Sequence, residues 1–189
     1  MDLTERQKEI TEAALNLIAE QGIQNLTIRN LSKAIGVTEA AIYRHFSSKQ
    51  EIIHALLQRC EDAVEWDENL RGWAALRSFA LGRISLILQR PELSRVFFSE
   101  EIFQNDEECR TMLQEMTLQH KGCLKDRFLE AQEDGELRRD IPLDTLFCLV
   151  FGPVRLLIKQ WGLRNGAFDL KQRGMELLDT LKMILHPAE

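Results

Sequence analysis

Apolar residues recur every three or four positions along most of this chain, the spacing that gathers side chains on one face of an α-helix. A shorter apolar segment covers residues 92–103. No alternation of apolar and polar residues is long enough for a β-strand, and no segment repeats. The chain is therefore predicted to be all-α. The ranges with helical spacing are 4–22, 27–35, 38–46, 48–64, 69–89, 106–135, 143–161 and 170–185.

Capping signals support several of these helix boundaries. Thr4 with Gln7, and Ser48 with Glu51, have the three-residue spacing of a capping box, in which each side chain bonds the other residue's backbone N–H. Gly22 stands where the first helix should end. The helix that follows Ser48 is the predicted bridge from the N-terminal segment to the rest of the chain.

The most informative segment is a pair of short helices on either side of Gly36. Thr27 and Thr38 stand at the predicted start of each helix, where a hydroxyl can accept from a free backbone N–H. Gly36 suits the left-handed turn between them. Ile42 and Phe46 lie four residues apart, so both can face a common core. This pattern is typical of a helix-turn-helix, which places its second helix in the DNA major groove.

Charge separates this segment from the rest of the chain. The whole chain has 24 Lys and Arg against 30 Asp and Glu, a net charge of −6, which repels a polyphosphate on average. Residues 26–50 instead carry four basic residues and one acid, so the local balance is 4 − 1 = +3. A local basic face is what phosphate contact requires. The alternative is a small helical core whose basic residues are only solvated; the agreement of caps, glycine and buried pair favours DNA binding.

The end of this segment resembles the signature of the TetR family of bacterial transcriptional regulators. The specific part is Tyr43-x-His45-Phe46-x-Ser48-Lys49, which a generic helix-turn-helix does not require. The preceding helix, with its Ala-Leu-x-Leu-Ile-Ala-Glu-x-Gly ending over 14–22, is similar to the family's first helix. The motif match covers residues 5–55. Beyond it, only the length and the all-helical pattern agree.

The resemblance implies DNA-contacting roles, and the chemistry of the side chains fits them. A tyrosine hydroxyl and a lysine ammonium can donate to phosphate oxygens, and an arginine can fork onto guanine O6 and N7. The roles implied for phosphate contact fall on Thr38, Tyr43, His45 and Lys49, and those for base reading on Arg29, Glu39, Ala40, Ala41 and Arg44. For His45, local packing is the alternative to phosphate contact.

The resemblance also implies a division of the chain. Residues 1–47 would form the helix-turn-helix DNA-binding domain, and residues 48–189 a helical domain for ligand binding and dimerisation. A small-molecule cavity is implied among the middle helices, although large apolar side chains are core residues by default. The candidate ligand-binding residues are Phe79, Phe97, Phe98, Phe103, Met112, Met116, Phe128 and Phe147.

A homodimer is expected for two reasons. A single helix-turn-helix reads only a few base pairs, so specificity requires two heads about one helical turn apart. The segment 143–161 is apolar nearly all round and should be buried on several sides, which one core cannot do alone; the alternative is that it packs only within the monomer. The resemblance points to the same two terminal helices. The candidate interface residues are Leu146, Val150, Val154, Leu157, Trp161, Leu178 and Leu181.

Several classes of function lack their motifs. There is no nucleotide-binding glycine loop, no H-E-x-x-H and no G-x-S-x-G, so we expect no enzyme and no cofactor. The four cysteines are widely spaced and are expected to be buried thiols. His120 and Cys123 lack a third ligand nearby, so no metal site is expected. No apolar run reaches the length of a membrane span and the first residues do not resemble a signal peptide, so a cytoplasmic protein without membrane contact is predicted.

The main hypothesis is thus a sequence-specific DNA-binding regulator, a repressor released from double-stranded operator DNA by an unknown small molecule. One alternative is a DNA-bound structural or interaction protein with the same head and no ligand. A regulator that responds to thiol oxidation or to a metal is the weaker alternative.

Overall fold

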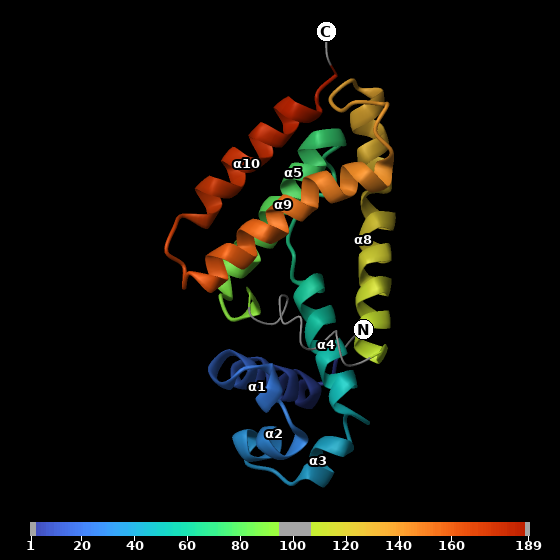
Figure 1. Ribbon diagram of the computed structural model, residues 1–189. Coiled ribbons are helices and arrows are strands. Elements are labelled where there is room, and N and C mark those ends of the chain that lie inside the picture. The colour runs from blue at the N-terminus through green and yellow to red at the C-terminus, as the bar shows by residue number, and fades with distance from the viewer. Residues whose placement is uncertain (1–2, 95–106, 188–189) are drawn as a thin grey trace. The chain divides into compact units, whose positions relative to one another are not determined.

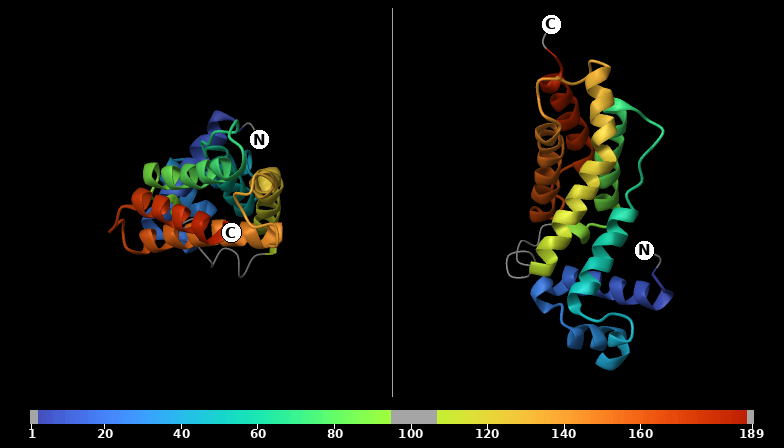
Figure 2. Two further views of the ribbon diagram at one scale, coloured as in Figure 1. Left: turned by 90° about the horizontal axis from the view of Figure 1, so that it is seen from above. Right: turned by 90° about the vertical axis from the view of Figure 1, so that its right-hand side faces the viewer.

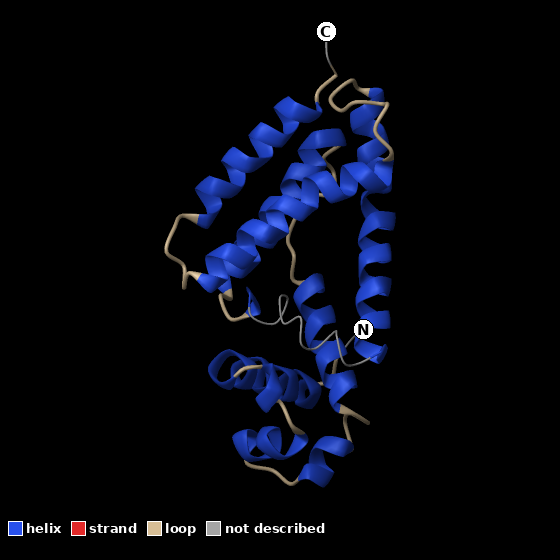
Figure 3. Cartoon of the chain, viewed as in Figure 1, coloured by secondary structure: helices blue, strands red, loops and turns tan. Residues whose placement is uncertain are grey.

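The computed structural model describes residues 3–94 and 107–187, and all regular structure in that part is helical (Figures 1 and 3). The all-α prediction is confirmed. By its contacts the chain forms two compact units. Unit 1 comprises residues Met1–Ala63 and Arg90–Gln114, and unit 2 comprises Val64–Gln89 and Glu115–Glu189.

Unit 1 contains the helix-turn-helix. Helix α1 packs against α2 and α4, and α2 packs against α3, so the four helices share one core (Figure 1). The bounds are α1 Glu5–Gln21, the short 3₁₀ turn η1 Ile23–Asn25, α2 Ile28–Ile35, α3 Glu39–Tyr43 and α4 Lys49–Asp62. Side chains that are almost fully buried in this core are Ile10, Ala14, Ile18, Leu31, Ile42, Phe46, Ile53 and Leu57.

Local signals define the helix starts of unit 1 as predicted. Thr4 forms a capping box with Gln7 at the start of α1. Thr27 accepts from the Asn30 N–H and Thr38 from the Ala41 N–H, so α2 and α3 are each capped by a threonine. Between them, Gly36 has φ 76° and ψ 34°, the left-handed conformation in which a Cβ is unfavourable.

The start of α4 differs from the predicted capping box. Ser48 caps the helix by accepting from the Glu51 N–H at 3.1 Å. The Glu51 carboxylate, however, accepts from the N–H and hydroxyl of Ser47, at 2.6 and 2.8 Å. The Glu51 carboxylate thus holds the residue before the cap and not the N–H of Ser48 itself.

Two predicted helix boundaries between the units are also wrong. Helix α4 ends at Asp62 and does not reach Val64, because the chain beyond it turns to pack on α5. Helix α5 (Gly72–Gln89) begins at Gly72, later than the predicted residue 69. Asp67 accepts from the Asn69 N–H and holds a turn there, and Gly72 itself has φ 52°.

Unit 2 contains α5, the part of α8 (Glu107–Glu133) from Glu115 onward, α9 (Leu143–Leu163) and α10 (Leu170–Leu185). Helices α9 and α10 run side by side in opposite directions, and both pack against α5 (Figures 1 and 2). Nearly fully buried side chains of this unit include Leu76, Ala80, Ile84, Leu124, Phe128, Leu146, Val150, Val154 and Leu178.

The N-terminus of α5 is capped by side chains from distant parts of the sequence. The Glu130 carboxylate accepts from the Gly72 N–H at 3.0 Å, and the Glu136 carboxylate accepts from the Trp73 N–H at 2.9 Å. Lys182 of α10 pairs with Glu136 at 3.0 Å. The first turn of α5 is therefore connected to both α8 and α10 within unit 2.

Candidate functional sites

The predicted DNA-contacting side chains lie on the surface of unit 1. Their anchors, Ile42 and Phe46, are buried in the core, while Tyr43 between them is 53% exposed. Because Ile42 and Phe46 are both buried, the polar residues between them are held on the surface, where a partner can contact them. The predicted residues that are exposed are Arg29, Thr38, Glu39, Ala40, Tyr43 and Arg44, and those that are partly exposed are Ala41, His45 and Lys49.

Helix α3 is short, and hydrogen bonds extend its geometry past Tyr43. The His45 and Phe46 N–H groups both donate to the Ile42 carbonyl, at 2.9 and 3.1 Å. The His45 carbonyl in turn accepts from the Gln7 side chain at 3.1 Å, which ties this turn to α1. Arg44 and His45 are thus held on an ordered turn.

Lys49 occupies the first position of α4, beside the cap residue Ser48. The first N–H groups of a helix and its dipole attract anions, and a lysine there adds a full positive charge. This arrangement suits a DNA phosphate.

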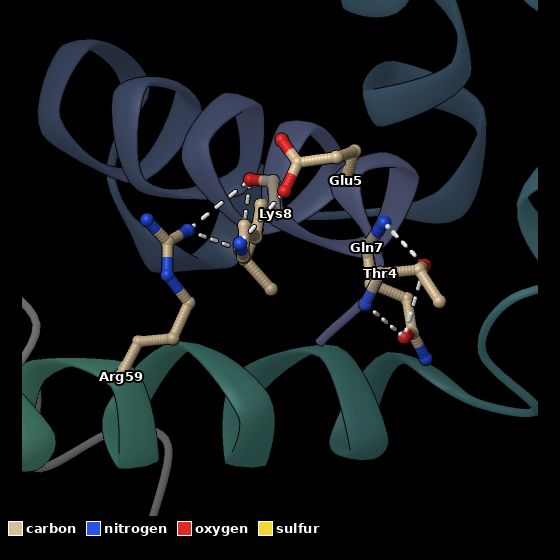
Figure 4. A network of polar contacts seen from close by, with 6 residues as sticks. Thr4, Glu5, Gln7, Lys8 and Arg59 are labelled. Carbon is tan, nitrogen blue, oxygen red and sulfur yellow. Dashed lines mark hydrogen bonds and ion pairs between the residues drawn. The ribbon is translucent and has the colours of Figure 1, made fainter. Parts of the chain in front are cut away.

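Polar contacts between α1 and α4 hold these two helices of unit 1 together. Arg59 of α4 donates to the Thr11 hydroxyl at 2.5 Å and to the Lys8 carbonyl at 3.1 Å (Figure 4). The Thr11 side chain is buried, so this contact is shielded from solvent. Lys8 also pairs with Glu5 in the first turn of α1.

Unit 2 holds a connected set of aromatic rings, which we call the aromatic cluster: Trp66, Phe79, His120, Phe128, Phe147 and Phe151. Phe79 of α5 contacts Trp66 and Phe151 at centroid distances of 5.6 Å each, and His120 at 5.9 Å. Phe151 of α9 also contacts Phe147 at 5.1 Å and Phe128 at 6.1 Å. Several pairs are close to perpendicular, the favoured edge-to-face arrangement.

Two cations lie over rings of this cluster. The Arg83 guanidinium is 5.8 Å from the Phe79 centroid, and the Lys121 ammonium is 5.6 Å from the Phe147 centroid. Lys121 also pairs with Asp144 at 2.9 Å, and this bond raises the pKa of Lys121 despite partial desolvation. Two rings of the cluster thus each have a cation over them, and one of these cations, Lys121, is paired with a carboxylate.

The predicted ligand-binding residues are only partly brought together. Phe79, Phe128 and Phe147 belong to the aromatic cluster, and Met116 is buried on α8. Phe97, Phe98 and Phe103, and the side chain of Met112, lie outside the described part of the chain. The prediction missed Trp66, His120 and Phe151. The four-residue spacing of Phe147 and Phe151 was a signal that could have found Phe151.

Most of the predicted dimer residues are buried within the single chain. Helix α9 is buried along only one stripe in the single chain, so one core does not cover all of its apolar faces. Leu157 and Leu181 are partly exposed, and the rest of the predicted set cannot present side chains to a second copy. The residues that pack in the chain's own core are Leu146, Val150, Val154, Trp161 and Leu178.

A different stripe of α9 is exposed. Leu149, Leu156 and Leu163 are 40%, 55% and 75% exposed and follow one another at seven-residue intervals, so they share a face. Gly152 lies on the same face, and a Cβ there would meet nothing within 4 Å. Met183 and Ile184 of α10 are exposed as well. An apolar face of this kind marks a contact surface.

Helix α9 is long and apolar enough, by length and composition, to cross a membrane, and it is the one such helix in the described residues. The core helix of a soluble protein meets the same criterion of length and composition. Helix α9 packs against both α5 and α10, as a helix of a bundle does.

The cysteines agree with the prediction only in part. Cys60 is buried, and desolvation raises its pKa to about 12. Its thiol therefore stays protonated and is a poor nucleophile. Cys123 and Cys148 are exposed, contrary to the expectation of burial, because each faces away from the bundle core. Among the residues that the structure describes, no group of three or more His, Cys, Asp or Glu could hold a metal ion.

Comparison with known proteins identifies the head. Residues 10–56 match the family model described as bacterial regulatory proteins, tetR family. The nucleoid occlusion factor SlmA of Haemophilus ducreyi is 43% identical over 61 residues, which are 32% of this chain and 30% of that protein. The chain thus matches less than a third of the length of this relative.

Longer matches cover both units. The transcriptional repressor AcnR of Corynebacterium diphtheriae is 28% identical over 154 residues, 77% of this chain and 75% of that protein. The structure of the transcriptional regulator FadR from Bacillus subtilis in complex with stearoyl-CoA has a TM-score of 0.80 at 22% identity, over 97% of this chain and all of that chain. That likeness shows a common fold. With the helix-turn-helix geometry of unit 1, the family match shows that residues 10–56 are a DNA-binding head of the TetR family of bacterial regulatory proteins.

Proposed function

We propose that this protein is a cytoplasmic, homodimeric repressor that leaves its operator DNA when an apolar molecule with an acidic group binds in unit 2. The observation that carries the proposal is that each unit holds a candidate site of its own. Unit 1 presents Tyr43, Arg44 and Lys49 on an ordered turn and a helix start. Unit 2 holds the aromatic cluster, which the DNA-binding role does not use.

The dimer is supported by the exposed face of α9. Leu149, Gly152, Leu156 and Leu163 share one face of α9 that the monomer leaves exposed. Two-fold pairing of this stripe would bury it against its own copy, as an isologous interface requires. It would also place two helix-turn-helix heads on one DNA molecule.

The effector class is supported by the composition of the aromatic cluster. Phenylalanine rings from α5, α8 and α9 suit an alkyl or ring system. Arg83 over the Phe79 ring and Lys121 over the Phe147 ring suit a carboxylate or phosphate. A fatty acyl thioester has both parts, and the similarly folded FadR of Bacillus subtilis is described in complex with stearoyl-CoA. Stearoyl-CoA is therefore the first probe to use.

The test is a titration of the protein–DNA complex. A DNA site selected from a random pool would be labelled, and its affinity measured by fluorescence anisotropy with stearoyl-CoA, stearate or CoA alone. We expect stearoyl-CoA to weaken DNA binding about fivefold or more, the size of an ordinary allosteric coupling, and CoA alone to have no effect. Unchanged affinity with both acyl compounds would contradict the effector class, and failure to select any DNA site would contradict the repressor.

A second candidate is a DNA-bound structural protein without an effector. The observation that favours it is the 43% identity of the head to a nucleoid occlusion factor. Chromatin immunoprecipitation separates the two functions. A repressor should occupy a few sites beside promoters, whereas a structural protein should occupy many sites spread along the chromosome.

A further inference from the structure

Residues 44–47, which we call the reading turn, connect two helices of unit 1 without belonging to either. Helix α3 has only five residues and ends at Tyr43, and α4 begins at Lys49. The reading turn carries Arg44 and His45, two of the predicted DNA-contacting residues. A helix as short as α3 is not stable by itself, so the position of the turn depends on contacts from other elements.

The first of these contacts comes from Gln7, in the first turn of α1. Its side-chain Nε2 donates to the His45 carbonyl at 3.1 Å in a partly buried position. A carbonyl oxygen is part of the main chain, so this bond fixes the backbone of the reading turn itself. A contact to the His45 ring would leave that backbone free to move.

The orientation of the Gln7 amide is set by the cap of α1. Its Oε1 accepts from the Thr4 N–H at 3.0 Å and from the Thr4 hydroxyl at 3.1 Å (Figure 4). A half-turn of the amide would direct its NH₂ group at the Thr4 N–H and its oxygen at the His45 carbonyl. The capping box therefore orients the donor that holds the reading turn.

The other end of the reading turn is held from α4. The Glu51 carboxylate accepts from the Ser47 N–H at 2.6 Å and from the Ser47 hydroxyl at 2.8 Å. Between the two ends, the Phe46 side chain is buried in the core. Three consecutive residues are thus fixed by α1, the core and α4 in turn. Arg44 comes directly before them, one residue from the bond of Gln7.

We infer that Gln7 is a positioning residue for sequence recognition, and that it acts through the His45 backbone on the placement of Arg44. This inference rests on the proposed DNA-reading role of Arg44. An arginine that forks onto a base must meet two acceptors at once, so a small shift of its backbone costs discrimination between bases. A lysine that contacts a phosphate is a flexible point charge and tolerates such a shift. Loss of the Gln7 bond should therefore affect base preference more than non-specific affinity.

The two functions of the Gln7 side chain can be separated by substitution. Gln7→Glu keeps an acceptor for the capping box but has no donor for the His45 carbonyl. Thr4→Val does the reverse, since it removes the capping hydroxyl and leaves the Gln7 amide. Gln7→Met removes both functions without adding charge. Gln21→Glu, at the exposed last position of α1, makes the same change of charge as Gln7→Glu and is the matched control.

The first measurement is base preference, obtained by selecting DNA from a random pool with the full chain and each variant. The position read by Arg44 is the one whose preference Arg44→Ala loses. There, Gln7→Glu and Gln7→Met should lower discrimination against the other base pairs about two- to tenfold, the range of one net hydrogen bond. Thr4→Val and Gln21→Glu should keep the wild-type preference. A role confined to the stability of α1 would instead make Thr4→Val resemble Gln7→Met.

The second measurement is hydrogen exchange on the DNA-free chain. The His45 and Phe46 N–H groups both donate to the Ile42 carbonyl, so their exchange reports how firmly the reading turn is held. Both amides should exchange several-fold faster in Gln7→Glu and Gln7→Met than in the wild type. Thr4→Val should leave them close to the wild-type rate.

Two results would overturn the inference. One is wild-type exchange of both amides in the two Gln7 variants. The other is full discrimination by these variants at the position that Arg44→Ala loses. If the wild type selects no DNA, or Arg44→Ala changes no position, the proposed function fails, and the inference about base reading fails with it. The exchange rates distinguish the two failures, because they test the hold of Gln7 on the reading turn without DNA.

Discussion

The rings of Trp66 and Phe79 lie almost perpendicular, at 87°, with their centroids 5.6 Å apart. Trp66 belongs to the segment that connects α4 to α5, and Phe79 belongs to the aromatic cluster. The contact therefore joins the candidate effector site to the segment that continues from α4. A ligand that displaced the Phe79 ring would lose or move this contact.

This relationship predicts a separation of ligand binding from DNA release. Trp66→Ala should still bind stearoyl-CoA, but its DNA affinity should respond several-fold less than that of the wild type, while Trp66→Phe keeps a ring and most of the response. Calorimetry gives the ligand affinity and anisotropy gives the DNA affinity. A Trp66→Ala variant that releases DNA as the wild type does would show that the contact plays no part.

The two roles predicted for the DNA-contacting residues, phosphate contact and base reading, predict two kinds of mutational effect. Lys49→Ala should weaken binding to all sequences about equally and reduce the slope of log affinity against log salt by about one. Arg44→Ala should instead change the preferred base at one position of each half-site. Lys171→Ala, an exposed lysine of α10, is the control and should leave the slope unchanged. The phosphate role of Lys49 fails if its variant keeps the wild-type slope.

Adding a side chain at Gly82 should disturb the packing of α5 against the segment that connects α4 to α5. A Cβ at this position would collide with the Glu65 carbonyl oxygen, so Gly82→Ala should lower the free energy of unfolding by about 1–3 kcal/mol. Gly122, inside α8, has nothing within 4 Å of a Cβ, and Gly122→Ala should raise stability by about 0.5–1 kcal/mol. Urea unfolding measures both. Two changes of the same sign would contradict the close approach at Gly82.

The carboxylate caps of α5 predict acid sensitivity. The pKa of Glu130 is lowered by the Gly72 N–H bond and by Arg127. Burial raises the pKa of Glu136, but the Trp73 N–H and Lys182 outweigh it and leave that pKa below its usual value. Since both folded-state pKa values are depressed, their stabilisation is present above the unfolded pKa of about 4.3 and is lost as the pH falls through the folded values.

The check is urea unfolding of the wild type and Glu130→Gln at pH 7 and below pH 4. The wild type should be the more stable at pH 7, and the difference between the two proteins should shrink as the pH falls. A difference that stays constant over this range would mean that ionised Glu130 does not cap the helix.

The exposed face of α9 predicts the oligomeric state. Leu156→Glu should give monomers that lose specific DNA binding, because it places a charge in the centre of the stripe. Leu118→Glu is the matched control, since Leu118 is 65% exposed on α8 and lies outside this face. Sedimentation would be run on both variants. A wild-type protein that is already monomeric at micromolar concentration would contradict the dimer.

The helix-turn-helix could be predicted from sequence because its signals are local. Thr27, Gly36 and Thr38 act within a few residues of themselves, and the structure places each as expected. The exposure of the predicted DNA-contacting residues follows from the same pattern, since the buried positions Ile42 and Phe46 fix the phase of the helix.

The sites of unit 2 could not be predicted in the same way, because they depend on contacts between distant segments. The segment of α9 is apolar nearly all round, so its spacing does not say which stripe faces the core, and most of the predicted dimer residues of α9 lie on the stripe that is buried within the chain. Trp66 and Phe151 meet Phe79 only through the packing of the connecting segment and α9 on α5. The caps from Glu130 and Glu136 likewise come from about sixty residues away.

Selection of bound DNA from a random pool tests the account most directly. Two identical heads held by the α9 face should enrich a palindrome whose half-sites lie on one side of the duplex, about 10–10.5 base pairs or a multiple apart. Leu156→Glu should lose this enrichment, and Leu118→Glu should retain it. A single unpaired half-site, or no enriched sequence at all, would contradict a dimeric sequence-specific regulator.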